Sequence, residues 1–225
     1  MNAADLEGKA SDEITEAVYT SDRLAASDLD HPAWQGARPV AIERYWSGED
    51  APAPRQAEAR ILWSETELCV RFDCRQTEPL VVSPQPQTER KEIGLWDRDV
   101  CELFIAPDRE LPERYFEFEA APNGEWLDLA VRHKPDTRDT DWNFSSGMTV
   151  ASRLSPGRVM IALRVPWEAL GRVPQFGEEW RANLFRCVGE GESRGYLAWR
   201  PTYTPEPDFH VPGAFGLIRF TGKNP

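Results

Sequence analysis

The chain has 225 residues, of which 40% are hydrophobic and 28% are charged, and this composition is typical of globular domains that bury a substantial core. The formal net charge of -12 opposes contact with phosphodiester backbones, and no basic stripe offsets it, so no nucleic-acid partner is expected. No apolar run approaches the ~20 residues that cross a bilayer, so the sequence predicts no membrane span.

The first residues carry neither the basic nor the apolar region of a secretory signal. This leaves two possibilities for the compartment, a cytoplasmic protein or one whose signal has been removed. Residues 1–12 are expected to be flexible, and no shift in composition divides the rest of the chain. We therefore expect a single domain over residues 13–225.

Apolar and polar residues alternate along most of the chain, which is the pattern of half-buried strands. The candidate strands cover residues 38–46, 58–65, 67–75, 99–107, 114–122, 125–133, 148–155, 157–165, 180–188, 195–201 and 215–220. Their hairpin spacing predicts an all-β, antiparallel two-sheet sandwich of the immunoglobulin or jelly-roll kind. A single helical turn is expected at residues 166–172, where proline comes early and glycine late.

Two long connections, residues 76–94 and 201–213, show no periodicity. Loops of this length inside one domain usually carry function or lack order.

The four cysteines are expected to be free thiols. Cys69 and Cys74 lie an odd number of residues apart on one predicted strand, so their side chains face opposite ways and cannot pair with each other. Cys101 and Cys187 fall inside apolar strands, where buried thiols behave as small hydrophobic groups.

Catalytic motifs are absent from the sequence: it has no glycine-rich phosphate loop, nucleophile elbow, HExxH or Cys-x-x-Cys pair. Only three histidines occur, and His210 is expected to anchor a loop. The nearest pair of carboxylates, Asp99 and Glu102, has an odd separation and therefore points to opposite faces of a strand. A glycan-active enzyme that uses Glu102 or Asp99 stays open as an alternative, provided that a second carboxylate faces one of them.

Glu102 interrupts an otherwise apolar strand, and such a carboxylate is either neutralised by Arg or Trp N–H groups or directed at a ligand. The positions of the tryptophans favour a ligand. Trp63, Trp126 and Trp180 fit a core, whereas Trp96 and Trp199 stand at strand ends beside the two long loops. Flat aromatic rings cover the apolar face of a sugar, and charged side chains bind its hydroxyl groups.

Several blocks, among them LWDRDVCELFIAPD and YLAWRPTYTPEPDFHVPGAFGLIRF, resemble carbohydrate-binding module family nine, in the DOMON-like group of β-sandwiches. The resemblance extends from about Ile14 to Phe220. It implies a non-catalytic protein that holds the end of a saccharide chain between the planes of Trp96 and Trp199, with Glu102 accepting hydroxyl hydrogen bonds. Further contacts are expected, on chemical grounds, from Asn183, Arg186 and Arg200.

The same family often holds a structural calcium ion. Clustered acidic residues, among which we select Asp28 and Asp30, supply oxygen ligands of the required kind, although a solvated acidic loop would look the same. Haem, which some DOMON relatives bind, is disfavoured because methionine and histidine ligands are scarce. A third class also remains open, a structural or protein-interaction sandwich in which both tryptophans are buried.

Overall fold

The structure is a computed structural model that describes residues 14–135 and 137–222. Its strands are β1 (Ile14–Tyr19), β2 (Val40–Ile42), β3 (Arg44–Tyr45), β4 (Ala57–Trp63), β5 (Glu67–Arg75), β6 (Val100–Ala106), β7 (Arg114–Ala120), β8 (Trp126–His133), β9 (Arg138–Asp141), β10 (Thr149–Ser155), β11 (Arg158–Pro166), β12 (Glu179–Val188), β13 (Gly195–Ala198) and β14 (Gly216–Thr221). The helical segments are α1 (Trp167–Leu170) and the 3-10 turns η2 (Pro32–Gly36), η3 (Ala53–Arg55), η4 (Leu95–Asp97), η5 (Gly191–Ser193) and η6 (Pro212–Ala214).

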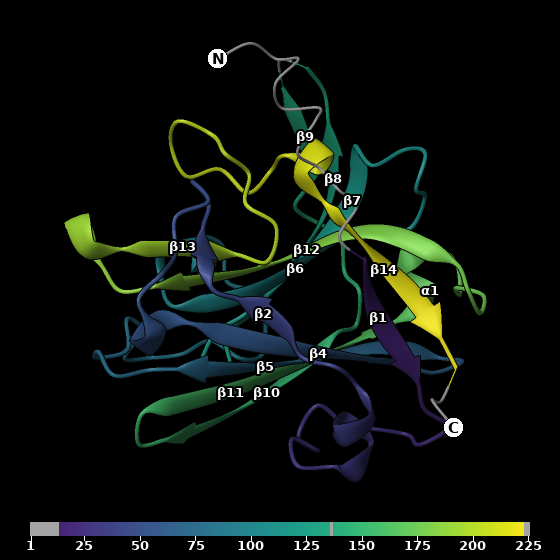
Figure 1. Ribbon diagram of the computed structural model, residues 1–225, viewed down its shortest axis with the longest axis horizontal. Coiled ribbons are helices and arrows are strands. Elements are labelled where there is room, and N and C mark those ends of the chain that lie inside the picture. The colour runs from purple at the N-terminus through teal and green to yellow at the C-terminus, as the bar shows by residue number, and fades with distance from the viewer. Residues whose placement is uncertain (1–13, 136, 223–225) are drawn as a thin grey trace.

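The strands form one continuous sheet that curls into two facing layers (Figure 1). The first layer contains β10, β11, β5 and β4, and the second contains β12, β6, β7, β8 and β9. Strands β1 and β14 stand between the layers in the strand order and join them. Strand β13 extends the second layer by pairing with β12, while β2 pairs with β4.

The predicted all-β sandwich is confirmed, but the expectation that every strand pairs antiparallel is wrong at β1. This strand runs parallel to both β14 and β4. The alternation pattern did not reveal β1, because only Ala17 and Val18 of its residues are buried. The sheet is therefore mixed, and its first and last strands are neighbours.

The main core lies between the two layers and consists mainly of the apolar side chains on the inward faces of the strands. Along β5, Leu68, Val70 and Phe72 are fully buried in it, whereas Arg71 and Asp73 point outward. Trp63 and Trp180 are buried as predicted, and Trp126 is partly buried against the same core. Burying apolar area at about 25 cal/mol per Å² is the principal force that holds the layers together.

A second apolar cluster covers the outer face of the second layer, so β6 is buried on both sides. Phe104 and Phe185 contribute from the sheet, and Phe209 and Phe215 contribute from the chain after β13. The rings of Phe185 and Phe209 stack with centroids 3.9 Å apart. These contacts tie the predicted irregular connection 201–213 to the sheet.

The short helical turn is confirmed as α1, which ends at Gly171 with a left-handed φ of 74°. All four cysteines are free and buried, as expected, and the Sγ atoms of Cys74 and Cys101 lie 3.4 Å apart across the main core. None of the described helices has the length and apolar character needed to cross a membrane. The expectation for residues 1–12 lies outside the described residues.

Candidate functional site

A pocket of about 390 Å³ opens on the outer face of the second layer, beside the second apolar cluster. We call it the Trp96 pocket. Its volume falls within the ~300–1,000 Å³ that is usual for small-ligand sites. Glu102 and Phe104 of β6 reach it because their side chains alternate with Cys101, Leu103 and Ile105, which enter the main core. The pocket is lined by Trp96, Asp97, Glu102, Phe104, Glu117, Leu129, Arg138, Thr140, Trp142, Cys187, Tyr196, Pro207, Asp208, Phe209 and His210.

Two tryptophans form one wall of this pocket, and both are accessible. Trp96 is 36% exposed and Trp142 is 46% exposed. Their ring centroids are 6.3 Å apart and their planes are inclined by 49°. Trp96 sits on η4, whose start at Gly94 has a left-handed φ of 85°, and the guanidinium of Arg194 donates to the Trp96 and Arg98 carbonyls. These bonds hold the backbone of the turn from which the Trp96 side chain projects.

The floor of the pocket is acidic. Burial, followed by repulsion from Glu117, raises the pKa of the Glu102 carboxyl to about 8, and burial raises the pKa of Glu117 to about 6. His210 borders these groups, with Nδ1 2.7 Å from the Tyr115 hydroxyl and Nε2 3.9 Å from a Glu117 oxygen. Burial lowers the pKa of His210 to about 3, so its ring is neutral at physiological pH. Its contact with Tyr115 shows that His210 anchors the late loop, as predicted.

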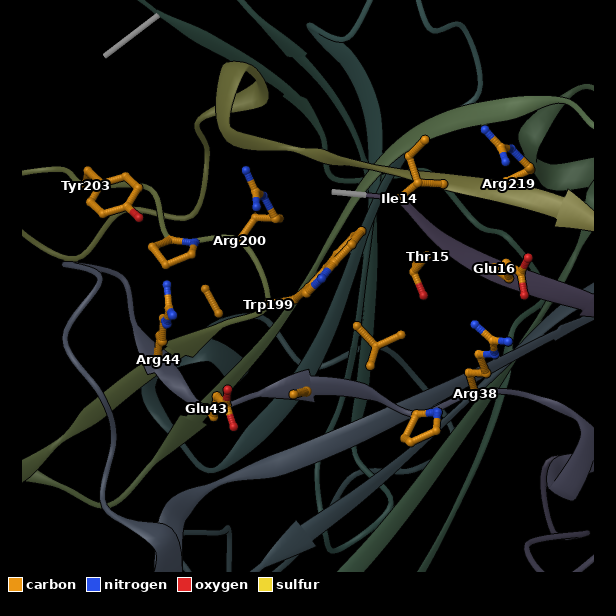
Figure 2. A pocket seen from close by; sticks show the side chains of 15 residues that line it. Ile14, Thr15, Glu16, Arg38, Glu43, Arg44, Trp199, Arg200, Tyr203 and Arg219 are labelled. Carbon is orange, nitrogen blue, oxygen red and sulfur yellow. The ribbon is translucent and has the colours of Figure 1, made fainter. Parts of the chain in front are cut away.

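Trp199 lines a different pocket, of about 530 Å³, on the opposite side of the second layer. Figure 2 shows its indole at the centre, with Arg44, Arg200 and Tyr203 to one side and Arg38 and Arg219 to the other. Trp199 is only 7% exposed because its ring packs into the main core, together with Leu197 two residues earlier on the same face. The structure therefore places Trp96 and Trp199 in two different pockets and does not bring them together.

Two of the remaining predicted contacts are buried inside the protein. Asn183 is fully buried, donates to the Arg200 carbonyl and accepts from the Arg200 and Leu184 amides. Arg186 is 3% exposed, and its guanidinium donates to the carbonyls of Arg55, Gln56 and Arg75 and to the Gln76 side chain. Both side chains use their polar atoms to hold neighbouring segments in place, and neither lines the Trp96 pocket.

The acidic residues selected for calcium have protein partners. An Asp28 carboxylate oxygen accepts from the Ala25 amide at 2.8 Å, and both carboxylate oxygens of Asp30 accept from Arg153. Asp99, the other carboxylate of the enzyme alternative, accepts from the Gly189 and Val81 amides and does not line the Trp96 pocket. Calcium at Asp28 and Asp30 stays a prediction.

Comparison with known proteins places the chain in a family. The model of the family described as carbohydrate family 9 binding domain-like matches residues 28–223. The chain belongs to this family. The resemblance in the LWDRDVCELFIAPD block and in the block from Tyr196 to Phe220 is thereby confirmed for most of the chain.

Three proteins are similar to this chain over most of its length. An extracellular protein of Arthroderma benhamiae is 23% identical over 184 residues, which cover 76% of this chain and 81% of the relative. A Bacteroides uniformis protein proposed to bind carbohydrate superposes with a TM-score of 0.73 at 17% identity, covering 92% of this chain and 99% of that one. A family 9 module of Caldicellulosiruptor kristjanssonii, solved with glucose and with cellotriose, gives a TM-score of 0.65 at 14% identity in each case. For those two structures, 94% of this chain is covered, together with 97% and 95% of the module.

Sequence reasoning missed several residues of the Trp96 pocket, above all Trp142, Tyr196 and Glu117. Trp142 follows β9, a strand with no apolar alternation, so its loop gave no sign of lying near Trp96. Glu117 lies in a strand that the alternation did predict, and a second carboxylate inside an apolar strand is the signal that could have found it. The residues that line the Trp96 pocket thus supply flat aromatic faces, carboxyl groups and one cation, Arg138.

Proposed function

We propose that this protein is a non-catalytic carbohydrate-binding module and that the saccharide binds in the Trp96 pocket. A sugar ring would stack on the indoles of Trp96 and Trp142, whose exposed faces suit its apolar C–H surface. Asp97, Arg138 and Asp208 at the rim offer charge-assisted hydrogen bonds to hydroxyl groups. Glu102 would bind a hydroxyl at the floor, as the family resemblance implies.

The observation that carries this proposal is the pair of exposed tryptophans on a polar pocket in a family 9 fold. The module from C. kristjanssonii was solved with glucose and with cellotriose, which makes glucose and short β-glucans the first ligands to try. In the Trp199 pocket the indole is largely covered by the core, so it cannot offer a comparable stacking face. We therefore propose that Trp142, and not Trp199, is the second aromatic residue that stacks on the sugar.

An enzymatic function is the less favoured alternative, and one observation keeps it testable. Glu102 titrates near neutral pH and has a second carboxylate close by, as an acid catalyst requires. However, Glu102, Glu117 and Glu119 lie together, within 4.8 Å of one another, on the sheet that forms the pocket floor. A glycosidase instead places two carboxyl groups on either side of the scissile bond. The arrangement favours binding without hydrolysis.

The test is isothermal titration of the protein with glucose, cellobiose and cellotriose, repeated for Trp96→Ala and Trp142→Ala. Binding at about micromolar affinity or weaker is expected, because a single sugar buries little area. Each alanine variant should weaken binding at least about fivefold, since a stacked ring contributes about 1 kcal/mol beyond area burial. The sugars recovered after incubation should be unchanged, whereas shortened products would support the enzyme.

Tyr203→Ala is the matched control, because Tyr203 is an exposed aromatic residue of the Trp199 pocket. It should bind saccharide like the wild type. If Tyr203→Ala lost binding while Trp96→Ala kept it, the ligand would lie in the Trp199 pocket. If no saccharide bound to the folded wild type, the carbohydrate proposal would fail.

A further inference from the structure

Three glutamates from neighbouring strands meet beneath the Trp96 pocket. Glu102 on β6 lies directly opposite Glu119 on β7, and Glu117 projects from the same face of β7 two residues earlier. Each residue offers a carboxylate oxygen, and these oxygens all lie within 4.8 Å of one another. All three side chains are buried, at exposures of 2%, 3% and 0% for Glu102, Glu117 and Glu119. We call this group the glutamate triad.

The protein supplies little to balance the charge of the triad. Glu117 and Glu119 share a side-chain hydrogen bond with each other, but both oxygens of Glu119 and one oxygen of Glu117 receive no bond from any other donor. Glu102 accepts only a weak bond from the Cys187 thiol, at 3.4 Å, among its described protein contacts. Within residues 14–135 and 137–222, no ion pair joins an Arg or Lys side chain to any of the three; the nearest basic nitrogen, on His210, is 3.9 Å from Glu117.

Such a group is costly unless something else neutralises it. Without a cation, a buried carboxylate must either take up a proton or destabilise the fold, and two further carboxylates nearby add repulsion. Elsewhere in the same layer the chain solves the problem with cations: buried Asp128 is paired with Lys91 at 2.6 Å, and buried Glu125 with Arg98 at 2.8 Å. Glu119 stands out because it is fully buried, faces its two acidic neighbours and has no such partner.

The geometry points to a divalent cation with oxygen preference, Ca²⁺ in the first place, bound by Glu102, Glu117 and Glu119. Three carboxylates supply the oxygen ligands that Ca²⁺ prefers, and Ca²⁺ tolerates flexible, irregular coordination, whereas Mg²⁺ demands near-ideal octahedral geometry and gives up its water reluctantly. The triad therefore suits Ca²⁺ better than Mg²⁺. Because Glu102 and Glu117 line the Trp96 pocket, an ion can enter from that side, and its remaining coordination positions face the ligand space.

This cation site is separate from the calcium site predicted at Asp28 and Asp30, whose carboxylates have protein donors. It also does not depend on the proposed saccharide function, because the ion is held by protein groups alone. A cation there would place a positive charge at the pocket floor, where sugar hydroxyl groups could complete its coordination.

The experiment is a thermal-unfolding titration of chelator-treated, sugar-free protein with Ca²⁺, Mn²⁺ and Mg²⁺. At a hundredfold excess of Ca²⁺ over its Kd, the Tm should rise by about 5 to 10 °C for a chain of this size. Tb³⁺, which takes calcium sites, should show luminescence sensitised by the nearby tryptophans Trp96 and Trp142. Mn²⁺ should give a comparable shift and Mg²⁺ a smaller one.

Glu119→Gln is the decisive variant, because it keeps the shape of the side chain and removes its charge. It should abolish the Ca²⁺-dependent rise, while its Tm without metal stays equal to that of the wild type or exceeds it. Asp30→Asn is the matched control and should keep the full rise. If Glu119→Gln does not fold, Glu117→Gln provides the same comparison. The proposal is overturned if no ion shifts the wild-type Tm, or if the rise survives in the triad variant and disappears in Asp30→Asn.

Discussion

Replacing Arg186 by methionine separates the structural role of this side chain from the sugar contact that its chemistry suggested. Methionine keeps most of the length of the arginine stem but has no donor. The change would leave the carbonyls of Arg55, Gln56 and Arg75 without the guanidinium that reaches them at 2.7, 3.2 and 2.8 Å. These carbonyls belong to the end of η3, to Gln56 directly after it and to the end of β5, so the guanidinium links the two layers.

The magnitude follows from the number of lost bonds. An unpaired buried acceptor costs about 1–3 kcal/mol, and broken buried networks typically cost 3–5 kcal/mol in total, so we expect a loss of about 4 kcal/mol. For a chain of this length that corresponds to a fall in Tm of about 8 to 16 °C. Saccharide affinity, measured well below the Tm, should not change.

Urea unfolding followed by tryptophan fluorescence measures this free energy, and calorimetric titration with cellotriose measures affinity. Arg132→Met is the control, because Arg132 is an exposed arginine on a strand and its replacement should cost less than about 0.5 kcal/mol. Trp96→Ala should show the converse behaviour, with weak binding and little loss of stability. An Arg186→Met variant that is as stable as the wild type but loses saccharide would refute this account.

Three further outcomes can be measured on the same protein. Lys91→Met should lower the free energy of unfolding by about 3 kcal/mol, because Asp128 is buried and loses its partner at 2.6 Å. Adding Asp128→Asn to the same chain should restore part of this stability. If the effects of the two substitutions on the free energy of unfolding were simply additive, the pairing would be contradicted. Native thiols should react very slowly with an aromatic disulfide reagent at pH 8, because all four are buried and burial raises the pKa of Cys69 to about 12. Denatured protein should titrate four thiols, and two would reveal a Cys74–Cys101 disulfide. Gly48→Ala should destabilise by about 1–3 kcal/mol in urea, because φ is 93° and the new Cβ would meet the Tyr203 ring. Unchanged stability would contradict both the backbone strain and the contact with this ring.

The strand content was predictable from the sequence because alternation reports burial directly. The predicted strand over residues 67–75 coincides with β5, and the helical turn coincides with α1. Strands β1 and β9 escaped prediction because few of their residues are buried, so hydrophobicity left no period to detect. Their pairing partners depend on contacts between distant parts of the chain, which local patterns do not encode.

The candidate site was predictable only in part, and the reason is again which way each side chain faces. Glu102 inside an apolar strand correctly indicated an unusual environment, and it lines the same pocket as Trp96. Trp199 also follows a strand next to a long loop, but it shares a face with Leu197 and so enters the main core. Asn183 and Arg186 have suitable chemistry for sugars, yet their polar atoms bind the protein backbone. Residue type alone could not reveal whether these polar atoms bind a ligand or the protein backbone.

The junction of β1 with β14 has a consequence for how the chain acquires its fold. Ile14 pairs with Leu217, so the two layers are joined along this edge only when the last strand docks. Until then β1 is held to β4 by the pairing of only two residues, Val18 and Tyr19. A shorter junction lies elsewhere, where β2 pairs with β4 and the following β3 pairs with β13. Contacts between residues so far apart in the sequence make folding slow. During synthesis on the ribosome, the edge of β1 that pairs with β14 would stay unpaired until nearly the whole chain had been made.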